Sequence, residues 1–557
     1  MSRARFPAAL AAIALFALLG AEVARFSLWT TSDEPAHLAA AREWRHGPGM
    51  VSNFEHPVLM KLLAGIFLAR EKPAMEIDET RAGRAAIPFL FLGLAVVTGL
   101  LGRALAGDAA GLAAAALVAI EPTLRGHGTL VQSDVLVTFF FVAAALALEL
   151  GARGEKRTML IASGVLYGFA MASKYSAFPF LAVFALVAMI RLASGSLSLK
   201  LKMGAALVVI ALATLFLIQF VAFAGTSDDT FRAAIAHEFN GLPQERAALA
   251  LARVFPKAIA AYGSGLLFVQ GVAGPGERFN YFFGEVSGKG NPFYFPVALG
   301  VKLTTATVLA FVASLLAAGI LLAGKARRRR ILAARAWLPA ALGGAYLAAA
   351  CSSNVNIGVR HVLPAVPFLL VSAAAAGRTF LARRPRALRA ALLGVVLFAA
   401  GESVLRLGRE ISFGNLLVGG PAGVPAVLSD SNVDWGQEQG QVFRRVRRGD
   451  LGSVGIASLI VDESGARAVG IAGQVTTPDA PVDTVFFSRF LWDTASAIEK
   501  NTESWPKFVW LRGWLPPLRH GLEARAVSVE PFGDAQFLLR LRAPATAAPS
   551  SSPAPTR

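Results

Sequence analysis

Long apolar stretches follow one another along this chain, and they constrain its fold more than any other feature of the sequence. A helix needs about 20 consecutive, mostly apolar residues to cross the hydrocarbon core of a bilayer. The chain has 557 residues, 55% of them hydrophobic, and its mean hydropathy is +0.55. Candidate spans lie near residues 6–25, 85–105, 109–123, 129–150, 158–173, 175–191, 203–224, 295–324, 331–351, 361–378 and 387–405. We therefore predict a polytopic α-helical membrane protein with about 11 transmembrane helices.

Positive charge is concentrated between these stretches. The chain carries 54 Lys and Arg against 36 Asp and Glu, a formal net charge of +18. Such a balance can indicate nucleic-acid binding, but the cations here form short clusters between apolar runs, as they do in cytoplasmic loops. The clusters are GRALAGD, GARGEKR, RLASGSLSLKLK, KARRRR and GRTFLARRPRALR. We predict an inner-membrane protein with a cytoplasmic N-terminus and no nucleic-acid partner.

The first apolar stretch follows Arg3 and Arg5 and resembles a signal peptide. Its core is long for a signal peptide, and AEVARF is an imperfect cleavage site. We therefore interpret this stretch as a retained signal anchor.

The same topology places the chemically interesting segments on the other, outer face. These segments are SDEPAHL, NFEHP, EPTLRGHGTLVQSD, SKYS, SSNVNIGVRH, the long segment 225–294 and everything after about residue 406. A transporter or flippase would place ionisable groups deep in its helices and would have internal repeats. The gathering at one membrane boundary favours an interfacial site, and we keep a transporter with an outer domain as the alternative.

The outer regions have some structure of their own. Segment 225–294 contains FRAAIAHEFNGLPQERAALALARVF, which predicts an amphipathic helix on the outer surface. After residue 406 the hydropathy falls, and short apolar runs alternate with turn residues, as in a soluble α/β domain. We predict a transmembrane domain over residues 1–405 with outer loops 26–84 and 225–294, an outer domain over 406–545, and a disordered tail over 546–557. An assembly or adhesion role for the outer domain would leave the acids of the first loop unexplained.

Two neighbouring acids, Asp33 and Glu34, follow the first span directly. Adjacent carboxylates at a low-dielectric boundary raise the pKa of one of them, toward a value that suits a general base. A structural alternative is that Ser32 or Asp33 caps the helix that Pro35 begins. Capping and catalysis are compatible.

Seven segments in order resemble the successive motifs of a known enzyme group. They are SDEPAHLAAAREW with NFEHPVLMKLLAG, HGTLVQSDVLVTFF, ASKYSAF, NYFFGEVSGKGNPFYFPVALGVKLT, NIGVRHVLPAVPFLLV and LSDSNVDWGQ. The group is the superfamily of bacterial membrane glycosyltransferases similar to protein O-mannosyltransferases and aminoarabinose transferases, which have the GT-C fold. The resemblance implies inverting transfer of a sugar from a polyprenyl-phosphate carrier to an acceptor on the outer face. The acceptor could be a protein hydroxyl, a lipid or a glycan, and the sugar is not identified.

The resemblance also implies roles for individual residues. Transfer needs a base for the acceptor hydroxyl and cations for the departing phosphate. Asp33 matches the family's acidic residue in the first outer loop and is our candidate base, with Glu34 as its catalytic neighbour. His56 matches a His-Pro motif near the substrates, although Pro57 could equally mark a helix start. Asp134 matches the acid of the second loop, where an N-cap is the structural alternative.

Three cationic or ionisable residues are candidates for the donor phosphate. Lys174 lies at a predicted turn of the chain, and Arg360 and His361 begin another span. Arg suits bidentate contact with phosphate, and Lys acts as a point charge. The alternative for both cations is that they snorkel to the membrane surface. His361 could instead be a neutral packing residue.

The segment Leu428–Gln437 gathers polar side chains around one aromatic ring. We predict that Asp430, Asn432, Asp434 and Trp435 form an acceptor-facing loop over the Asp33 cavity. The alternative is that the polar residues build tight turns and that Trp435 plugs the outer domain onto the membrane domain.

No strong metal motif is present in the sequence. Asp33 and His37 share a helical face at i and i+4, but two groups do not make a site. Some members of the resembled families use a divalent cation and others do not, so the sequence leaves the use of a metal ion open. The expected partners are the polyprenyl-phosphate sugar donor, the acceptor and membrane lipids.

Overall fold

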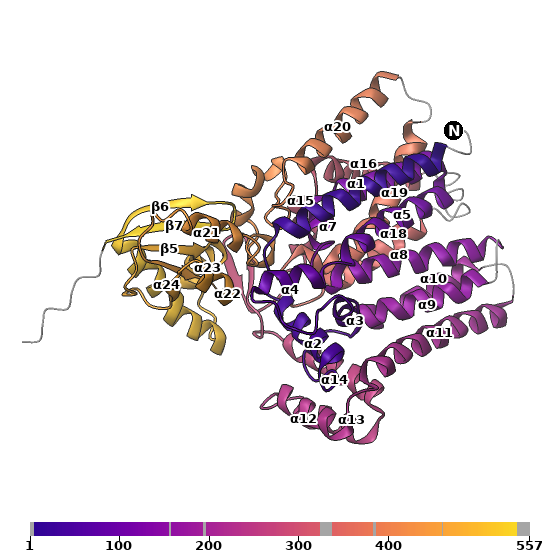
Figure 1. The fold of residues 1–557 in the computed structure, drawn as a ribbon. Coiled ribbons are helices and arrows are strands. Elements are labelled where there is room, and N and C mark those ends of the chain that lie inside the picture. The colour runs from indigo at the N-terminus through magenta and orange to yellow at the C-terminus, as the bar shows by residue number, and fades with distance from the viewer. Residues whose placement is uncertain are drawn as a thin grey trace, which may run out of the picture.

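The computed structural model describes residues 5–154, 158–192, 196–323, 337–381, 386–458 and 461–542. The predicted tail over 546–557 and the cluster KARRRR lie outside these residues. Within the described part, helices dominate the first three quarters of the chain, and a mixed sheet follows (Figure 1).

Five helical segments are long and apolar enough to cross a membrane, judged by length and composition. They are Arg5–Ser27, Glu76–Ala106, Ser133–Ala152, Leu197–Phe223 and Val359–Arg378. Six shorter apolar helical stretches accompany them, at Asp108–Ile120, Thr158–Ser173, Ala177–Arg191, Thr305–Leu316, Leu338–Cys351 and Leu393–Val404. The prediction of a helical membrane protein is therefore confirmed.

Most of these apolar helices lie side by side in one bundle (Figure 1). The apolar helices are α1 (Arg5–Ser27), α5 (Ile87–Ala106), α6 (Asp108–Ile120), α8 (Ser133–Ala152), α9 (Thr158–Ser173), α10 (Ala177–Arg191), α11 (Leu197–Phe223), α16 (Thr305–Ala323), α18 (Leu338–Cys351), α19 (Val366–Leu381) and α20 (Arg386–Val404). Small residues let neighbouring helices approach closely. A Cβ atom on Gly111 of α6 would lie 2.5 Å from the carbonyl oxygen of Gly99 on α5.

Two predicted spans are interrupted. The span at 295–324 divides into α15 (Tyr294–Lys302) and α16, because Asn415 Nδ2 donates to the carbonyls of Gly300 at 2.6 Å and Leu303 at 2.8 Å. The span at 361–378 begins as the 3-10 helix η1 (Val359–Ala365), which contains Pro364, before α19 follows.

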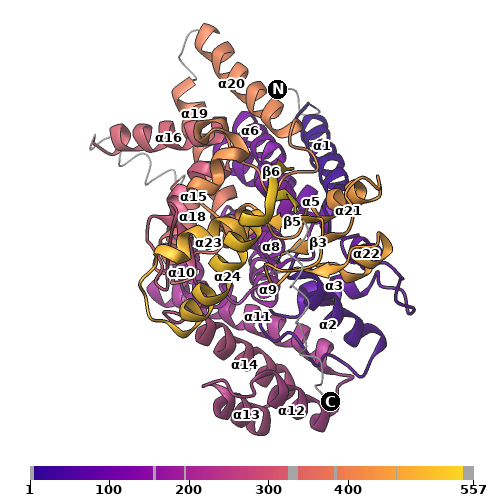
Figure 2. The same cartoon turned by 90° about the vertical axis from the view of Figure 1, so that its left-hand side faces the viewer.

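Short helices gather at one end of the bundle, next to the sheet (Figure 1). They are α2 (Glu34–His46), α3 (Leu59–Gly65), α4 (Glu76–Gly83) and α7 (Pro122–His127). The predicted single amphipathic helix is instead two helices, α12 (Asp228–Glu238) and α13 (Glu245–Val254), because Gly241 between them has a φ of +73°. With α14 (Lys257–Val272) they extend from the bundle on the side opposite α20 (Figure 2).

Residues 454–541 contain a five-stranded mixed sheet with strand order β4-β3-β5-β7-β6. Its strands are β3 (Val454–Ala457), β4 (Gly473–Gln474), β5 (Thr484–Ser488), β6 (Ala526–Phe532) and β7 (Gln536–Leu541). β3 pairs in parallel with β4 and β5, whereas β7 pairs antiparallel with β5 and β6. The accompanying helices are α21 (Gln439–Val446), α22 (Glu463–Ala468), α23 (Arg489–Lys500) and α24 (Pro506–Arg525). A separate hairpin pairs β1 (Asn280–Phe282) with β2 (Glu285–Ser287).

Three short 3-10 turns join the bundle to the sheet region. They are η2 (Leu416–Val418), η3 (Gly420–Ala426) and η4 (Asp430–Asn432). The largest apolar core fills the bundle, and smaller cores lie on the two faces of the sheet. The loop before α2 lies where the bundle meets the sheet region: Trp29 Nε1 donates to Asp462 at 2.8 Å, and the Trp29 ring packs edge-on against Phe443.

Candidate active site

Asp33 lies at the N-terminal end of α2, in the tight loop that precedes this helix. Pro35 lies in the first turn of the helix, where proline is favoured. Its side chain makes no capping hydrogen bond to α2. Instead, Asp33 Oδ2 accepts a hydrogen bond from Arg360 Nη1 at 2.8 Å, and Oδ1 accepts one from Ser32 at 3.1 Å. The Asp33 side chain is 29% exposed, whereas Glu34 is fully buried. Only the first of the two acids is open to a reacting molecule.

Arg360 brings distant parts of the chain together at this point. It lies on η1, and its guanidinium carbon lies 4.2 Å from the centroid of the Trp435 ring. Its Nε atom is buried without a hydrogen-bond partner among the described residues. The next residue, His361, has a buried Nε2 atom in the same condition. The site therefore presents a buried guanidinium N–H without a partner, of the kind that an anionic ligand would bind, and a buried imidazole nitrogen beside it.

The electrostatics of Asp33 differ from the prediction. Burial alone would raise the pKa of its carboxyl, but the Arg360 guanidinium and His56 hold that pKa well below its ordinary value. The predicted rise does not apply to Asp33, because its carboxylate is paired with Arg360. Glu34 is paired with a different cation, Arg84, at 2.5 Å. In this state Asp33 is an ionised but weakly basic group.

Two histidine rings adjoin the acid. The centroids of His37 and His56 are 4.6 Å apart. Burial, with Lys61 next in effect, lowers the pKa of His37 to about 4, and burial and His37 lower the pKa of His56. Both ring nitrogens of His37 are buried without a partner in the described part of the chain. His37 is absent from the site residues predicted from the sequence. Its i,i+4 spacing from Asp33 is the feature that could have placed it there.

Asp134 and Lys174 form an ion pair with each other. Asp134 is 1% exposed, on the first turn of α8, and one of its carboxylate oxygens, Oδ2, has no partner within the described residues. Lys174 lies at the turn between α9 and α10, as predicted, and its side chain is 14% exposed. The structure thus gives Lys174 a carboxylate partner, so a donor phosphate would have to share this cation.

The segment around Trp435 lies against the Asp33 loop. Ser32 N donates to the carbonyl of Trp435 at 3.1 Å, and Trp29 N donates to that of Gln437 at 2.9 Å. Asp430 has an unusual φ of +59°, and burial raises the pKa of its carboxyl to about 6. The charges of Arg360 and Asp33 both act on Asp430, so it belongs to the same cluster.

Two other residues of this segment are fully engaged in contacts within the protein. Asn432 is buried: its Oδ1 accepts from Val359 N at 2.9 Å, and its Nδ2 donates to the Tyr294 hydroxyl at 2.9 Å. Asp434 accepts hydrogen bonds from Ser488 and, at 3.0 Å, from Gln536 in the sheet region. The structure therefore gives Asn432 and Asp434 bracing contacts, whereas Asp430 and Trp435 are the members of the segment that adjoin Arg360.

The described residues contain no group of three or more His, Cys, Asp or Glu side chains that could hold a metal ion. The chemistry that this site can perform with its own residues is proton acceptance by Asp33 and anion stabilisation by Arg360.

The chain was compared with known proteins. Residues 83–219, about a quarter of the chain, match the family described as dolichyl-phosphate-mannose-protein mannosyltransferase. The apo oligosaccharyltransferase of Archaeoglobus fulgidus superimposes with a TM-score of 0.50 at 13% identity, covering 96% of this chain and 74% of that one. No curated protein sequence matches the chain.

Two further solved structures show weaker likeness. ArnT from Cupriavidus metallidurans bound to undecaprenyl phosphate has a TM-score of 0.48 at 11% identity, over 97% of this chain and 98% of that one. The S. cerevisiae protein O-mannosyltransferase Pmt1-Pmt2 complex bound to the sugar donor has a TM-score of 0.36 at 15% identity. The match covers 41% of this chain and 35% of that one. The archaeal structure and the family match together confirm the resemblance to GT-C glycosyltransferases.

Proposed function

We propose that this chain, which has the GT-C fold of membrane glycosyltransferases, transfers a sugar from a polyprenyl-phosphate carrier to an acceptor hydroxyl outside the membrane. The family match over residues 83–219 supports this substrate class. The single observation that carries the proposal is the ion pair between Asp33 and Arg360 at 2.8 Å. It places a base and a phosphate-binding cation side by side at the end of the apolar bundle, where a lipid-linked phosphate and a polar acceptor meet.

The reaction that we infer is a single displacement with inversion. The acceptor oxygen attacks the anomeric carbon, its proton passes to the Asp33 carboxylate, and the bond from that carbon to the phosphate oxygen breaks. The phosphate leaves with the bonding electron pair, and Arg360, with Lys174 and His361 nearby, stabilises its charge. Asp134 and His56 support these groups. Glu34 is too deeply buried to take part directly.

The ion pair between Asp33 and Arg360 implies that the donor binds before the acceptor reacts. Arg360 lowers the pKa of Asp33 while the two are paired. A donor phosphate competes with Asp33 for the guanidinium and adds negative charge beside it. Both effects raise the pKa of Asp33, so donor binding makes the carboxylate a stronger base before the acceptor reacts.

A transporter is the weaker alternative, because the ionisable cluster gathers at one end of the bundle, where α2 begins (Figure 1). Purified protein in liposomes that contain a radiolabelled polyprenyl-phosphate sugar pool separates the two functions. The proposal predicts that wild-type protein cleaves the labelled lipid and transfers label to an acceptor fraction. Movement of intact lipid between leaflets without cleavage would contradict it.

We further propose the membrane arrangement. The eleven apolar helices found among the described residues cross the inner membrane, with the N-terminus cytoplasmic, and residues 406–545 form an extracytoplasmic domain above the site. The acceptor class follows from comparing the glycans of surface proteins, lipids and polymers in cells with and without the protein.

A further inference from the structure

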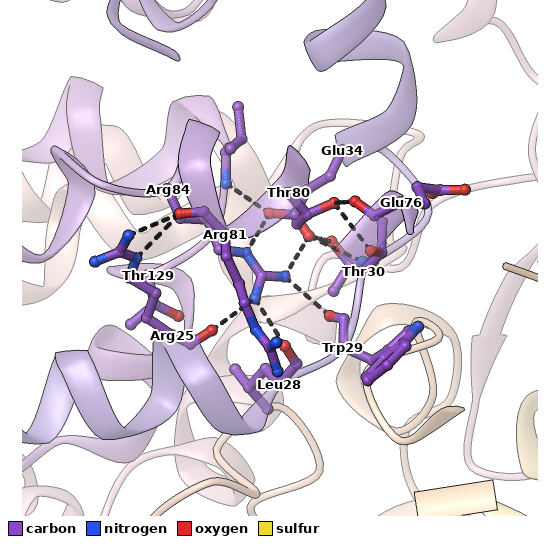
Figure 3. A network of polar contacts seen from close by, with 12 residues as sticks. Arg25, Leu28, Trp29, Thr30, Glu34, Glu76, Thr80, Arg81, Arg84 and Thr129 are labelled. Atoms are coloured by element: carbon purple, nitrogen blue, oxygen red, sulfur yellow. Dashed lines mark hydrogen bonds and ion pairs between the residues drawn. The ribbon is translucent and has the colours of Figure 1, made fainter. Parts of the chain in front are cut away.

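Glu34 and Arg84 form an ion pair of which both members are fully buried (Figure 3). The contact is bidentate: Arg84 Nε lies 2.7 Å from Glu34 Oε1, and Arg84 Nη2 lies 2.5 Å from Glu34 Oε2. Isolated buried charges are costly, and a buried ion pair often contributes no more to stability than apolar residues of similar size. The presence of this pair directly beside Asp33 therefore calls for a role other than bulk stability.

The remaining donors of Arg84 all reach backbone carbonyls at the end of α1. Nη1 donates to Arg25 at 3.2 Å and to Leu28 at 2.8 Å, and Nη2 donates to Trp29 at 2.9 Å. In Figure 3 these carbonyls surround the guanidinium, and the Trp29 side chain points away from it. One side chain thus fixes the path of the chain as it leaves α1.

Glu34 fixes the other half of the same loop. Its Oε2 accepts from the backbone N–H and hydroxyl of Thr31, at 2.9 and 3.0 Å. Its Oε1 accepts from Val131 N at 2.9 Å, in the segment that precedes α8 and Asp134. Neither carboxylate oxygen faces solvent, so Glu34 cannot contact a substrate.

We propose that Glu34 and Arg84 are positioning residues that set the Asp33 carboxylate against Arg360. This inference rests on the proposed function and assigns Glu34 a role different from that of a catalytic acid. Asp33 lies between Thr31 and Glu34, in a loop whose shape the pair determines. With Glu34 held inward, the carboxylate of the preceding residue projects toward η1. A shift of about 1 Å in a reacting group can reduce turnover by about 100-fold.

The test uses detergent-purified full-length variants, with turnover measured per folded molecule and stability measured by thermal unfolding. We expect Glu34→Gln and Arg84→Lys to lose stability and to lower kcat by about 10- to 100-fold. The donor KM should change by less than about 3-fold, because Arg360 is untouched.

The double variant Glu34→Leu/Arg84→Met distinguishes positioning from stability. Replacing both members by apolar residues removes the buried charges, so the double variant should be more stable than either single variant, although the backbone groups that the pair bound lose their partners. The bonds to the loop are still missing, so kcat should stay low. A double variant with both wild-type stability and wild-type kcat would overturn the inference.

Glu149→Gln is the matched control. Arg191 binds Glu149 in the same bidentate way, at 2.6 and 2.8 Å, and Glu149 lies about four helical turns from Asp134 along α8. This variant should lose stability while each folded molecule keeps its kcat, and an equal loss of kcat would also overturn the inference. Wild-type protein is assayed in parallel: absence of wild-type turnover with the labelled lipid pool would refute the proposed function, whereas an active wild type with active pair variants would refute only the positioning role.

Discussion

Two adjacent acids, Asp33 and Glu34, have different surroundings and therefore different chemistry. Asp33 is partly exposed and paired with Arg360, which lies 327 positions later in the sequence. Glu34 is fully buried and paired with Arg84. A carboxylate that is ionised, partly accessible and next to a cation can accept a proton once that cation moves to another anion.

The pH dependence of Arg360→Gln follows from this pair. Asp33 works as a base only when deprotonated, so activity falls as the pH drops through its pKa. Arg360 holds that pKa below its ordinary value, while burial opposes this effect. The variant should therefore move the acidic limb of acceptor kcat/KM to higher pH. The donor KM should also rise by about 10- to 150-fold, the equivalent of a charge-assisted hydrogen bond of about 1.5–3 kcal/mol. An acidic limb at the wild-type pH would contradict this assignment.

The sequence predicted the main residues of the candidate site but not which residues they contact. Asp33, Arg360 and Trp435 were each identified from their motifs, and the structure brings them into contact. Lys174 was assigned to the donor, yet it pairs with Asp134. Partner choice depends on how distant segments pack, which periodicity and local spacing do not contain.

At the scale of elements, apolar runs predicted where helices form but not where they break. The break between α15 and α16 depends on Asn415, which satisfies two carbonyls from more than 100 positions away. The split between α12 and α13 could have been foreseen, because Gly241 and Pro243 interrupt the amphipathic pattern. Breaks set by local residues are predictable, and breaks set by tertiary hydrogen bonds are not.

Within the segment Leu428–Gln437, the aromatic residue Trp435 tests the role of the segment. The sequence predicts that this loop faces the acceptor, and on that basis Trp435→Ala would impair the acceptor step alone. Because the Trp435 ring lies under Arg360, we now expect the donor KM to rise as well, by about 2- to 30-fold, the equivalent of a cation–π contact of about 0.5–2 kcal/mol. Trp435→Phe, which keeps a ring face, should restore most of this loss. An unchanged donor KM in Trp435→Ala would support the original acceptor-only role.

At the scale of the whole molecule, the bundle and the sheet region meet at one end (Figure 1). The loop that carries Asp33 lies at this junction, because Trp29 of the same loop contacts Asp462 and Phe443. Cysteine labelling tests the proposed orientation after the single native residue, Cys351, is replaced by Ser. Asn432 is buried and would be a poor probe, so exposed Thr477 in the sheet region is preferable. Thr477→Cys should react with an impermeant reagent from outside, and Ala109→Cys only after the inner membrane is opened. The reverse labelling pattern would contradict the proposed orientation.

The most direct test of the central claim is the transfer rate of Asp33→Asn. The amide keeps the size of the side chain and can still contact Ser32, but it cannot accept a proton from the acceptor hydroxyl. With folding verified by thermal unfolding and donor binding measured separately, we predict a loss of kcat of about 10²- to 10⁴-fold while the labelled lipid still binds. Near-normal transfer of the labelled sugar by Asp33→Asn would contradict the account.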